Sequence, residues 1–473
     1  MNNTSTLNWD TVFAVPITSV NKAIKDMKSS PSSFSYSSEK SSISGNYSDW
    51  AITTGGDGGN IYMVIPITDL CGICSFGKFS CSSLKVIAEV KLEFIHSDEG
   101  DDYYDLVVKS SDGTSENPII SIKNIIPDEA FTGDAVEMVG EETVISVFSA
   151  FIDACLTANL YEFAHVFATV NLNDYIDKYD QWAWCKPSFV DYAYSECEND
   201  KSKSMLGVLC MTGGRTATAA QLQQIDPFVI PEKSNAGYLV SPARLLLDLM
   251  LPAFPIYWKN AKIDDFELIE KASTDTGKYQ YVLALKENKS IRLDDVQNNG
   301  TSYTPYIKEL SIDFDGTDLI FNSYTETDVG MGVTAWCRAT HYYTIELSEN
   351  QNGQTLIYKE IKPAETSNGT YSSAATMIEE ALILLASVVI TIILGLVTDG
   401  VGFFVGSVII GCLTGIALTA PEMIDLVNSD TSPSIDLMIN NLSNPIRWNA
   451  SDVFRLDYAG INNGLQLGGD LLL

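Results

Sequence analysis

The chain has 473 residues, of which 45% are hydrophobic and 19% are charged, a composition typical of a globular protein with room for two or three cores. Acidic residues outnumber basic ones by 61 to 29, so the formal net charge is -32 and the isoelectric point is about 4.3. A field of this sign repels the phosphates of nucleic acids, which argues against DNA and RNA as partners. It also argues against simple electrostatic docking on anionic lipid.

Nine cysteines in a chain of this length are too sparse for a disulfide scaffold. Cys71 and Cys74 form one CxxC pair, and Cys81 follows nearby. A zinc or redox site would need a second such pair or a nearby histidine, and the three histidines of the chain are scattered. We therefore expect thiols in a strand and its turn, and no metal or other cofactor.

The first ten residues, MNNTSTLNWD, have neither a basic region nor a run of apolar residues. A secretory signal peptide needs both. The expected protein is cytosolic, or it leaves its cell by another route.

An amphipathic helix is predicted over residues 16–28, with Ile17, Val20, Ile24 and Met27 on one face. The serine-rich stretch that follows, residues 29–42, has two interpretations. It is either a linker or an edge strand, and the alternation of its aromatic residues favours the strand.

Long strands come next. Residues 50–67 are interpreted as strand, glycine-rich turn and strand, because no helix pattern or GK[ST] follows the glycines as a phosphate loop requires. Residues 85–96 alternate apolar and polar side chains over twelve positions, which is typical of a long half-buried strand. A helix is predicted at 144–156, where apolar residues recur at helical spacing.

The second half repeats this plan. A short apolar helix is expected from Pro242 to about Leu251. The DFDGTD sequence lacks the glycine position and closing glutamate of a calcium loop, so we interpret it as a hairpin turn. Alternating patterns predict strands at 278–287, 306–314, 318–327, 333–347, 354–362 and 451–460. A sheet this extensive with so few helices, each of them apolar, suggests sheets curled around helices.

Several strings resemble, in wording and order, the OrfX and 47-kDa accessory proteins of clostridial botulinum-type neurotoxin gene clusters. The similarity runs nearly from end to end, and the IDPFVIP and NAG block is its most specific part. The strings are WDTVFAVPITSVNKAI (9–24), SDWAITTGGDGGNIYMVIPI (48–67), EFAHVFATVNLN (162–173), GVLCMTGGRTATAAQLQQIDPFVIPEKSNAGYLVSPARLLLDLMLPAF (207–254) and FRLDYAGINNGLQLGG (454–469).

The resemblance implies an α+β, TULIP-like fold similar to bactericidal/permeability-increasing protein, in which long curved antiparallel sheets wrap around apolar helices. We expect two pseudo-repeated lobes, residues 1–235 and 236–473, the second including an apolar helical hairpin at 377–426. The resemblance further implies a non-enzymatic protein that is encoded beside a large neurotoxin, and it leads us to expect binding to lipids, including phosphoinositides, or assembly with sibling proteins. It supplies no catalytic residues to carry over. A bacterial cytoplasmic protein that is later released or secreted without a recognisable signal peptide is expected.

The apolar hairpin raises the question of membrane contact. Residues 381–398 carry no charge and would measure about 27 Å as a helix, close to the roughly 30 Å of a bilayer core. Residues 401–421 would form a second pass. However, no Lys or Arg occurs between Lys362 and Arg447 to anchor the ends of such a span.

Three interpretations of the hairpin therefore stay open: a helical pair buried in the protein, a pair that leaves the sheet to meet lipid, and a permanent membrane anchor. A helix that is apolar all round is normally buried all round, which favours the first. In the second case acid would ease insertion by neutralising the flanking carboxylates. The side chains expected to meet lipid are Leu384, Ile390, Ile393, Phe403 and Phe404.

Signatures of enzymes are not found: the sequence has no GxSxG, no HExxH and no Walker loop. The leading hypothesis is a non-enzymatic toxin accessory that binds lipid, sibling accessory proteins of the cluster, or the neurotoxin. The alternative is a membrane-inserting or pore-forming toxin component that acts through residues 381–421. A pure scaffold, with basic partners that complement the charge of -32, is the third.

Overall fold

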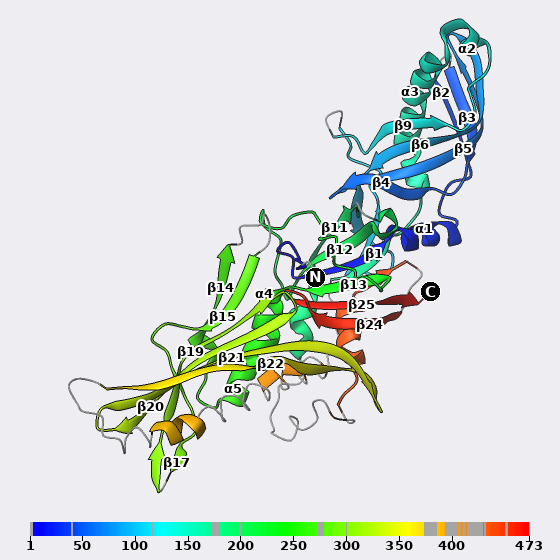
Figure 1. Ribbon diagram of the computed structural model, residues 1–473. Helices are drawn as coiled ribbons and strands as arrows, with labels where there is room; N and C mark the ends of the chain where they lie inside the picture. The colour runs from blue at the N-terminus through cyan, green and yellow to red at the C-terminus, as the bar shows by residue number, and fades with distance from the viewer. Residues whose placement is uncertain are drawn as a thin grey trace.

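The structure is a computed structural model of an elongated α+β molecule (Figure 1). It describes residues 3–38, 41–114, 117–172, 180–197, 200–272, 279–298, 300–372, 386–392, 404–405, 408–409, 413, 429, 432–449 and 453–472. Within these residues, antiparallel sheets dominate and helices are few. The architecture is the expected α+β, TULIP-like one, with curved sheets around apolar helices.

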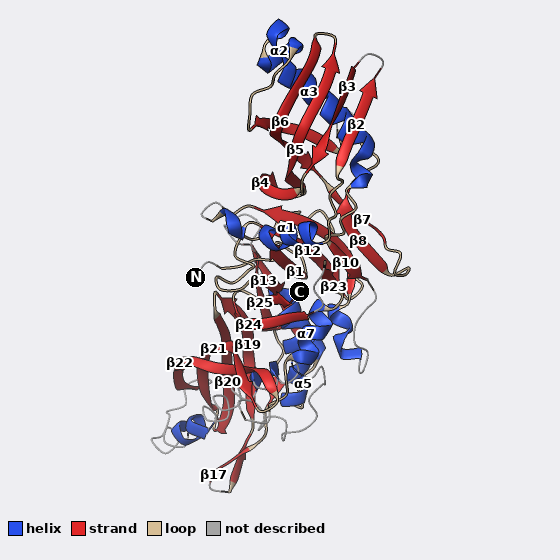
Figure 2. Ribbon diagram, turned by 90° about the vertical axis from the view of Figure 1, so that its right-hand side faces the viewer, coloured by secondary structure: helices blue, strands red, loops and turns tan. Residues whose placement is uncertain are grey.

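One end of the molecule is a six-stranded sheet with the order β2-β3-β5-β6-β9, and β4 added to β5. In Figures 1 and 2 the helix α3 (Glu141–Asn159) runs along this sheet, and the short α2 (Asp134–Val139) lies at its far tip. The strands are β2 (Ser33–Ser38), β3 (Ser41–Tyr47), β4 (Ala51–Asp57), β5 (Asn60–Cys74), β6 (Gly77–Val90) and β9 (Ile120–Pro127).

The helix α3 confirms the prediction at 144–156 and extends it by a few residues at each end. Its buried positions follow the spacing of one helix face: Val144, Phe148, Ile152, Cys155 and Leu156. With its extension to Glu162, this is the one helix among the described residues that is long and apolar enough to cross a membrane by composition alone. Its buried face packs on the sheet, as a core helix of a soluble protein also would.

The serine-rich stretch is a hairpin of two strands, so the linker interpretation is wrong. β2 forms the edge of the six-stranded sheet and pairs with β3, and Phe34 is its buried residue. Cys71 and Cys74 lie on β5 and Cys81 lies on β6, which confirms the interpretation of these thiols.

The other end of the molecule is a 13-stranded sheet with the order β11-β12-β1-β13-β25-β24-β21-β20-β19-β15-β14, to which β16 and β22 are added. Strand β1 lies between β12 and β13, and β13 also pairs with β25, so segments from both ends of the chain meet side by side. Its strands are β1 (Thr11–Pro16), β11 (Pro187–Ser195), β12 (Met205–Thr212), β13 (Ala236–Val240), β14 (Phe266–Ala272), β15 (Tyr279–Leu285), β16 (Ile291–Arg292), β19 (Pro305–Asp315), β20 (Asp318–Gly330), β21 (Val333–Asn350), β22 (Gly353–Ser372), β24 (Val453–Ile461) and β25 (Leu465–Leu472).

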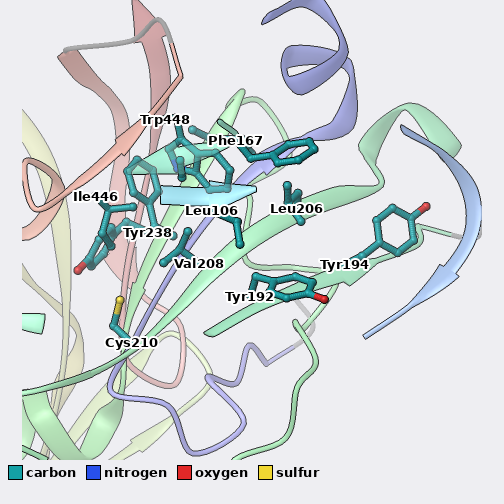
Figure 3. Packing of buried hydrophobic residues seen from close by; sticks show 14 of the residues in the cluster. Leu106, Phe167, Tyr192, Tyr194, Leu206, Val208, Cys210, Tyr238, Ile446 and Trp448 are labelled. Atoms are coloured by element: carbon teal, nitrogen blue, oxygen red, sulfur yellow. The ribbon is translucent and has the colours of Figure 1, made fainter. Parts of the chain in front are cut away.

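A four-stranded sheet, β23-β10-β8-β7, packs between these two large sheets. Figure 3 shows the shared core, where Trp448 and Leu106 from the small sheet meet Tyr238 and Val208 from the large one. The strands of the small sheet are β7 (Leu92–His96), β8 (Tyr103–Val108), β10 (Ala168–Asn171) and β23 (Ile446–Trp448), and β17 (Val296–Asn298) and β18 (Thr301–Tyr303) form a separate pair.

Short helices close the ends of these sheets. The predicted helix at 16–28 is α1 (Ile17–Asp26); Ile17, Val20 and Ile24 are buried as expected, but Met27 lies after the helix and is exposed. Helix α7 (Asp436–Ser443) precedes β23. Short 3-10 helices are also found among the described residues, at Leu160–Glu162, Asp180–Cys185, Lys201–Lys203 and Ile263–Asp265.

The helix expected from Pro242 to about Leu251 runs further, to Tyr257. It begins as α4 (Pro242–Arg244), continues as a π-helical turn (Leu245–Met250) and a 3-10 turn (Leu251–Ala253), and ends as α5 (Phe254–Tyr257). Two prolines, at 252 and 255, lack the N–H groups of a regular α-helix, so the hydrogen-bond pattern shifts from turn to turn.

The predicted long strands of the second half are all present, and the DFDGTD sequence is the β19–β20 turn. The predicted border between two lobes lies at residue 235. The 13-stranded sheet contains strands from both sides of this position, since β1 pairs with β12 and with β13, and the division into two lobes stays a prediction.

Candidate functional site: an apolar segment under the C-terminal sheet

The first described part of the apolar segment is the helical stretch 386–392. Ile390 is only 5% exposed, and it belongs to one buried cluster with Ala386 and Val389. The cluster is completed by residues of β18, β20 and β21, namely Tyr303, Val329, Val333, Ala335, Cys337 and Ala339. Because the inward positions of β21 carry small side chains, the helical stretch can lie close to the sheet.

The second described part centres on Phe404, which is fully buried. Its ring stacks on Phe254 of α5 with the centroids 4.7 Å apart, and it lies 5.9 Å from the ring of Trp258 and 5.7 Å from that of Phe321 on β20. Phe254 also stacks on Phe266 of β14 at 4.3 Å. Apolar side chains of the same segment, Val405, Val408, Ile409 and Leu413, are buried in the same core.

Of the five residues expected to meet lipid, the structure describes two. Ile390 and Phe404 face the protein interior and lie in separate apolar clusters, while Leu384, Ile393 and Phe403 lie outside the described residues. Contact of these side chains with lipid stays a prediction. The residues that receive Phe404 come from distant parts of the chain, and the aromatic run FPIYW at 254–258 is the signal that could have found them.

A histidine lies beside these aromatic residues. His341 on β21 is fully buried, opposite Phe321 in the strand register, and its ring lies 6.5 Å from that of Phe321 and 6.4 Å from that of Tyr343. Neither of its ring nitrogens has a hydrogen-bond partner in the described part of the chain. Burial lowers the pKa of His341 below its ordinary value of 6.5, so the ring is held neutral.

A group of charged side chains lines a cleft of ≈ 220 Å³ next to β1. The Asp10 carboxylate accepts from Arg215 Nε at 2.8 Å and from the Thr212 backbone N–H at 2.8 Å, and it pairs with Arg244 Nε at 3.1 Å. Arg244 also pairs with Asp248 at 3.0 Å, and burial raises the pKa of Asp248 although Arg244 opposes the rise. Two cations and two carboxylates balance here, so the network ties the start of β1 to α4 and to the loop after β12.

Within the described ranges, no three His, Cys, Asp or Glu side chains come together as metal ligands. Most of the described cysteine thiols are buried, and burial raises the pKa of Cys185 and of Cys210 to about 12, which disfavours the reactive thiolate; Cys71 is exposed.

The fold and its apolar core place the molecule among TULIP-like proteins, in which curved sheets enclose apolar helices. The chain belongs to the OrfX-like family, because the family model for Protein OrfX2/OrfX3/P47 matches residues 6–469. This family consists of accessory proteins of toxin gene clusters.

Two relatives are similar over their whole length. The chain is 41% identical over 489 residues to Protein OrfX3 of Paraclostridium bifermentans, covering 99% of this chain and 98% of the relative. It is 37% identical over 489 residues to Protein OrfX3 of Clostridium botulinum (strain Kyoto / Type A2), covering 99% of each.

Two solved structures resemble the chain in fold. P47 from Clostridium botulinum A2 has a TM-score of 0.65 and covers 99% of this chain and 98% of its own. P47 of Clostridium botulinum E1 has a TM-score of 0.61 and covers 100% of both chains. Each is 16% identical, so the likeness concerns the fold alone.

Proposed function

We propose that this protein is a non-enzymatic accessory of a toxin cluster that binds lipid, through the apolar segment around Ile390 and Phe404, and sibling proteins of the cluster. The observation that carries the lipid half is the apolar packing of this segment. Its described contacts to the sheet are made by hydrocarbon and aromatic side chains, which acyl chains can replace without leaving a buried polar group unpaired.

Flotation of the protein with vesicles tests the lipid half. Phosphatidylcholine vesicles with and without a phosphoinositide, at pH 5 and pH 7.5, cover the neutral and the anionic headgroup. We expect the protein to float with at least one of these compositions. If it floats with none at either pH, lipid binding is wrong and binding to partner proteins alone remains.

A pair of variants then asks whether the apolar segment makes the contact. Val388 lies on the helical stretch 386–392 but is 45% exposed, so Val388→Asp leaves the folded protein intact. A segment that enters lipid would have to carry this charge with it, and flotation should fall at least tenfold. Met138→Asp is the matched control, because Met138 is 71% exposed on α2, at the other end of the molecule from the segment (Figure 1). Equal flotation of both variants and the parent protein would refute contact through this segment.

The partner half rests on charge. A net charge of -32 favours partners with basic surfaces, and such complexes weaken when salt screens the attraction. Co-purification of the cluster's products with this chain should be lost on raising the salt from about 0.05 M to about 0.5 M. Retention at high salt would count against an electrostatic interface.

A second candidate function, a membrane-inserting toxin component, is favoured by His341. An open form that exposes this ring to water would let it take up a proton near pH 6.5, whereas the closed form resists protonation. Acid therefore favours the open form. Dye release from vesicles should increase between pH 7.5 and pH 5, and His341→Leu should remove most of that increase. An increase that is the same in the variant would contradict this role of His341.

A further inference from the structure

The outward face of the sheet β19–β22, opposite the face that holds the apolar segment, carries a group of aromatic residues. Along β21 the inward positions hold Ala335, Cys337 and Ala339, and the outward positions between them hold Trp336 and Arg338. The same alternation places Tyr324 and Glu326 outward on β20. Figure 1 shows these strands side by side at the end of the molecule away from α3.

The strand register brings these residues together in neighbouring rows. One row runs Tyr306, Glu326, Trp336, Gly369 across β19, β20, β21 and β22. The next row runs Glu309, Tyr324, Arg338 across the first three of these strands. Tyr371 of β22 stands two residues beyond Gly369, on the side of the row away from Arg338.

Trp336 is held in position by a glycine. A β-carbon on Gly369 would lie only 3.0–3.1 Å from three atoms of the indole, so the ring packs against bare backbone that a side chain would push away. The indole lies 6.2 Å from the ring of Tyr324 at an angle of 47°. Because Trp336 is only partly buried, it offers surface to solvent beside Tyr324.

The carboxylate of Glu326 is also held in position. Its Oε1 accepts hydrogen bonds from the hydroxyls of both Tyr324 and Tyr371, each at 2.7 Å. A phenol that donates to a carboxylate loses its proton less readily. The hydrogen bond to Glu326 therefore raises the pKa of Tyr371, and burial raises it further. The carboxylate is therefore oriented, and no hydrogen bond to its other oxygen is found among the described residues.

A guanidinium completes the surface. Arg338 lies 4.2 Å above the ring of Tyr324 and pairs with Glu309, with its Nη1 at 2.8 Å and its Nη2 at 3.3 Å from the two carboxylate oxygens. Both charged side chains are exposed. The arrangement brings a fixed aromatic ring, an oriented acceptor and a guanidinium to one face of the sheet, where Trp336 and Glu326 are partly exposed and Arg338 is exposed.

We propose that this aromatic surface, defined by Tyr306, Tyr324, Glu326, Trp336, Arg338 and Tyr371, binds a neutral saccharide. One side of a hexose ring presents C–H groups of partial positive charge, which suit the negative face of an aromatic ring, while the ring's hydroxyls need oriented acceptors and donors. The indole of Trp336 supplies the first kind of contact, and Glu326 with Arg338 supplies the second.

Other ligand classes fit this surface less well. An apolar partner would leave Glu326, Arg338 and Glu309 desolvated, and a nucleic acid would meet the field of a chain with net charge -32. A quaternary ammonium ion is usually enclosed by several aromatic faces, and here the Arg338 guanidinium occupies that of Tyr324 and would repel a second cation.

Saturation-transfer NMR tests the proposal without lipid or partner protein, using lactose, cellobiose and maltose at about 10 mM with the full chain. We expect transfer to the C–H protons of at least one of the three sugars, with a dissociation constant in the millimolar range. The absence of transfer to all three would overturn the proposal. Because no lipid is present, this result is independent of the vesicle experiments.

Variants locate the contact. Trp336→Ala should weaken binding at least tenfold, Trp336→Phe should restore part of it, and Glu326→Gln should weaken it severalfold. Tyr342→Ala is the matched control: Tyr342 lies on the same face of β21, but its ring is covered by Lys362 Nζ at 3.7 Å, so its loss should change the affinity less than twofold. Unchanged binding by Trp336→Ala, in a variant whose circular dichroism matches that of the parent protein, would place the sugar elsewhere and overturn the assignment.

Discussion

The ring of Phe404 stacks on the ring of Phe254 with their centroids 4.7 Å apart, and this contact joins the apolar segment to α5. Phe404→Ala removes a fully buried aromatic ring and leaves a cavity between α5 and β20. We expect a loss of about 3–5 kcal/mol in the free energy of unfolding, measured by urea denaturation. Val388→Asp, on an exposed position of the same segment, should change it by less than about 1 kcal/mol. A Phe404→Ala variant as stable as the parent protein would show that this ring is not a structural anchor.

The unpartnered His341 predicts a gain of stability on its removal. His341→Leu replaces two buried ring nitrogens that have no partner among the described residues by a hydrocarbon, which should stabilise the fold by about 1–2 kcal/mol at pH 7.5. Because burial lowers the pKa of His341 in the folded state, the unfolded chain binds the proton more readily as the pH falls through 6.5. The advantage of the variant should therefore grow at pH 5. An advantage that shrinks in acid would contradict the assigned burial.

Protonation of His165 should also destabilise the folded state in acid, over a defined pH range. Its Nδ1 lies 2.8 Å from Ser29 Oγ, and burial lowers its pKa from 6.5 to about 4. The folded state therefore loses stability as the pH falls from about 6.5 to about 4, up to a total of about 3 kcal/mol, and the loss is complete below that range. His165→Gln should flatten this part of the stability profile, measured by urea denaturation at half-unit steps of pH. An unchanged profile would mean that His165 is not buried in its neutral form.

The ion network around Asp10 predicts a large loss when its central carboxylate is neutralised. Asp10→Asn leaves the nearly buried Arg244 without its partner at 3.1 Å, and Arg215 without its partner at 2.8 Å. The expected loss is about 3–5 kcal/mol, measured by thermal or urea denaturation. Asp128→Asn is the control, since its pair with Lys85 is exposed and should matter by less than about 1 kcal/mol. Equal effects of the two changes would deny Asp10 its structural role.

Thiol labelling checks the placement of the cysteines. Cys71 is exposed on β5, while Cys74 and Cys81 of the same hairpin are buried. The rapid phase of the reaction with Ellman's reagent at pH 8 should therefore lose one thiol in the Cys71→Ser variant and none in Cys81→Ser. Loss of a rapidly reacting thiol in Cys81→Ser would show that the hairpin packs differently.

Local pattern predicted most of the elements, because helices and hairpins are short-range structures. The single strand predicted at 85–96 was wrong: it divides after Val90 into β6 and β7, which belong to different sheets. The spacing of Val144, Phe148 and Ile152 predicted α3, and the DFDGTD sequence predicted the β19–β20 turn. Strand pairing between distant segments carries no such signal. Nothing in the sequence of β1 shows that it pairs with β12 and β13, about two hundred residues away, or that β23 pairs with β10.

Members of the candidate site could be predicted from the sequence, but the residues that pack against them could not. Ile390 and Phe404 could be predicted because both lie within a long run of apolar residues, which is visible in the sequence. Their partners could not be deduced, because the small inward residues of β21 and the ring of Phe254 gain their meaning only when the sheet is formed. The helix from Pro242 runs beyond its predicted end for a related reason: packing of Phe254 against Phe266, on a distant strand, stabilises a further turn.

The pairing of β13 with both β1 and β25 has a consequence for synthesis on the ribosome. Strand β1 finds its neighbours β12 and β13 only after some two hundred further residues, and β25, the second neighbour of β13, is made more than two hundred residues later still. During that interval the early strands expose unpaired backbone edges, to which neighbouring nascent chains can bind. A slow step that depends on the final strands, together with a need for a chaperone at those edges, follows from the strand order alone.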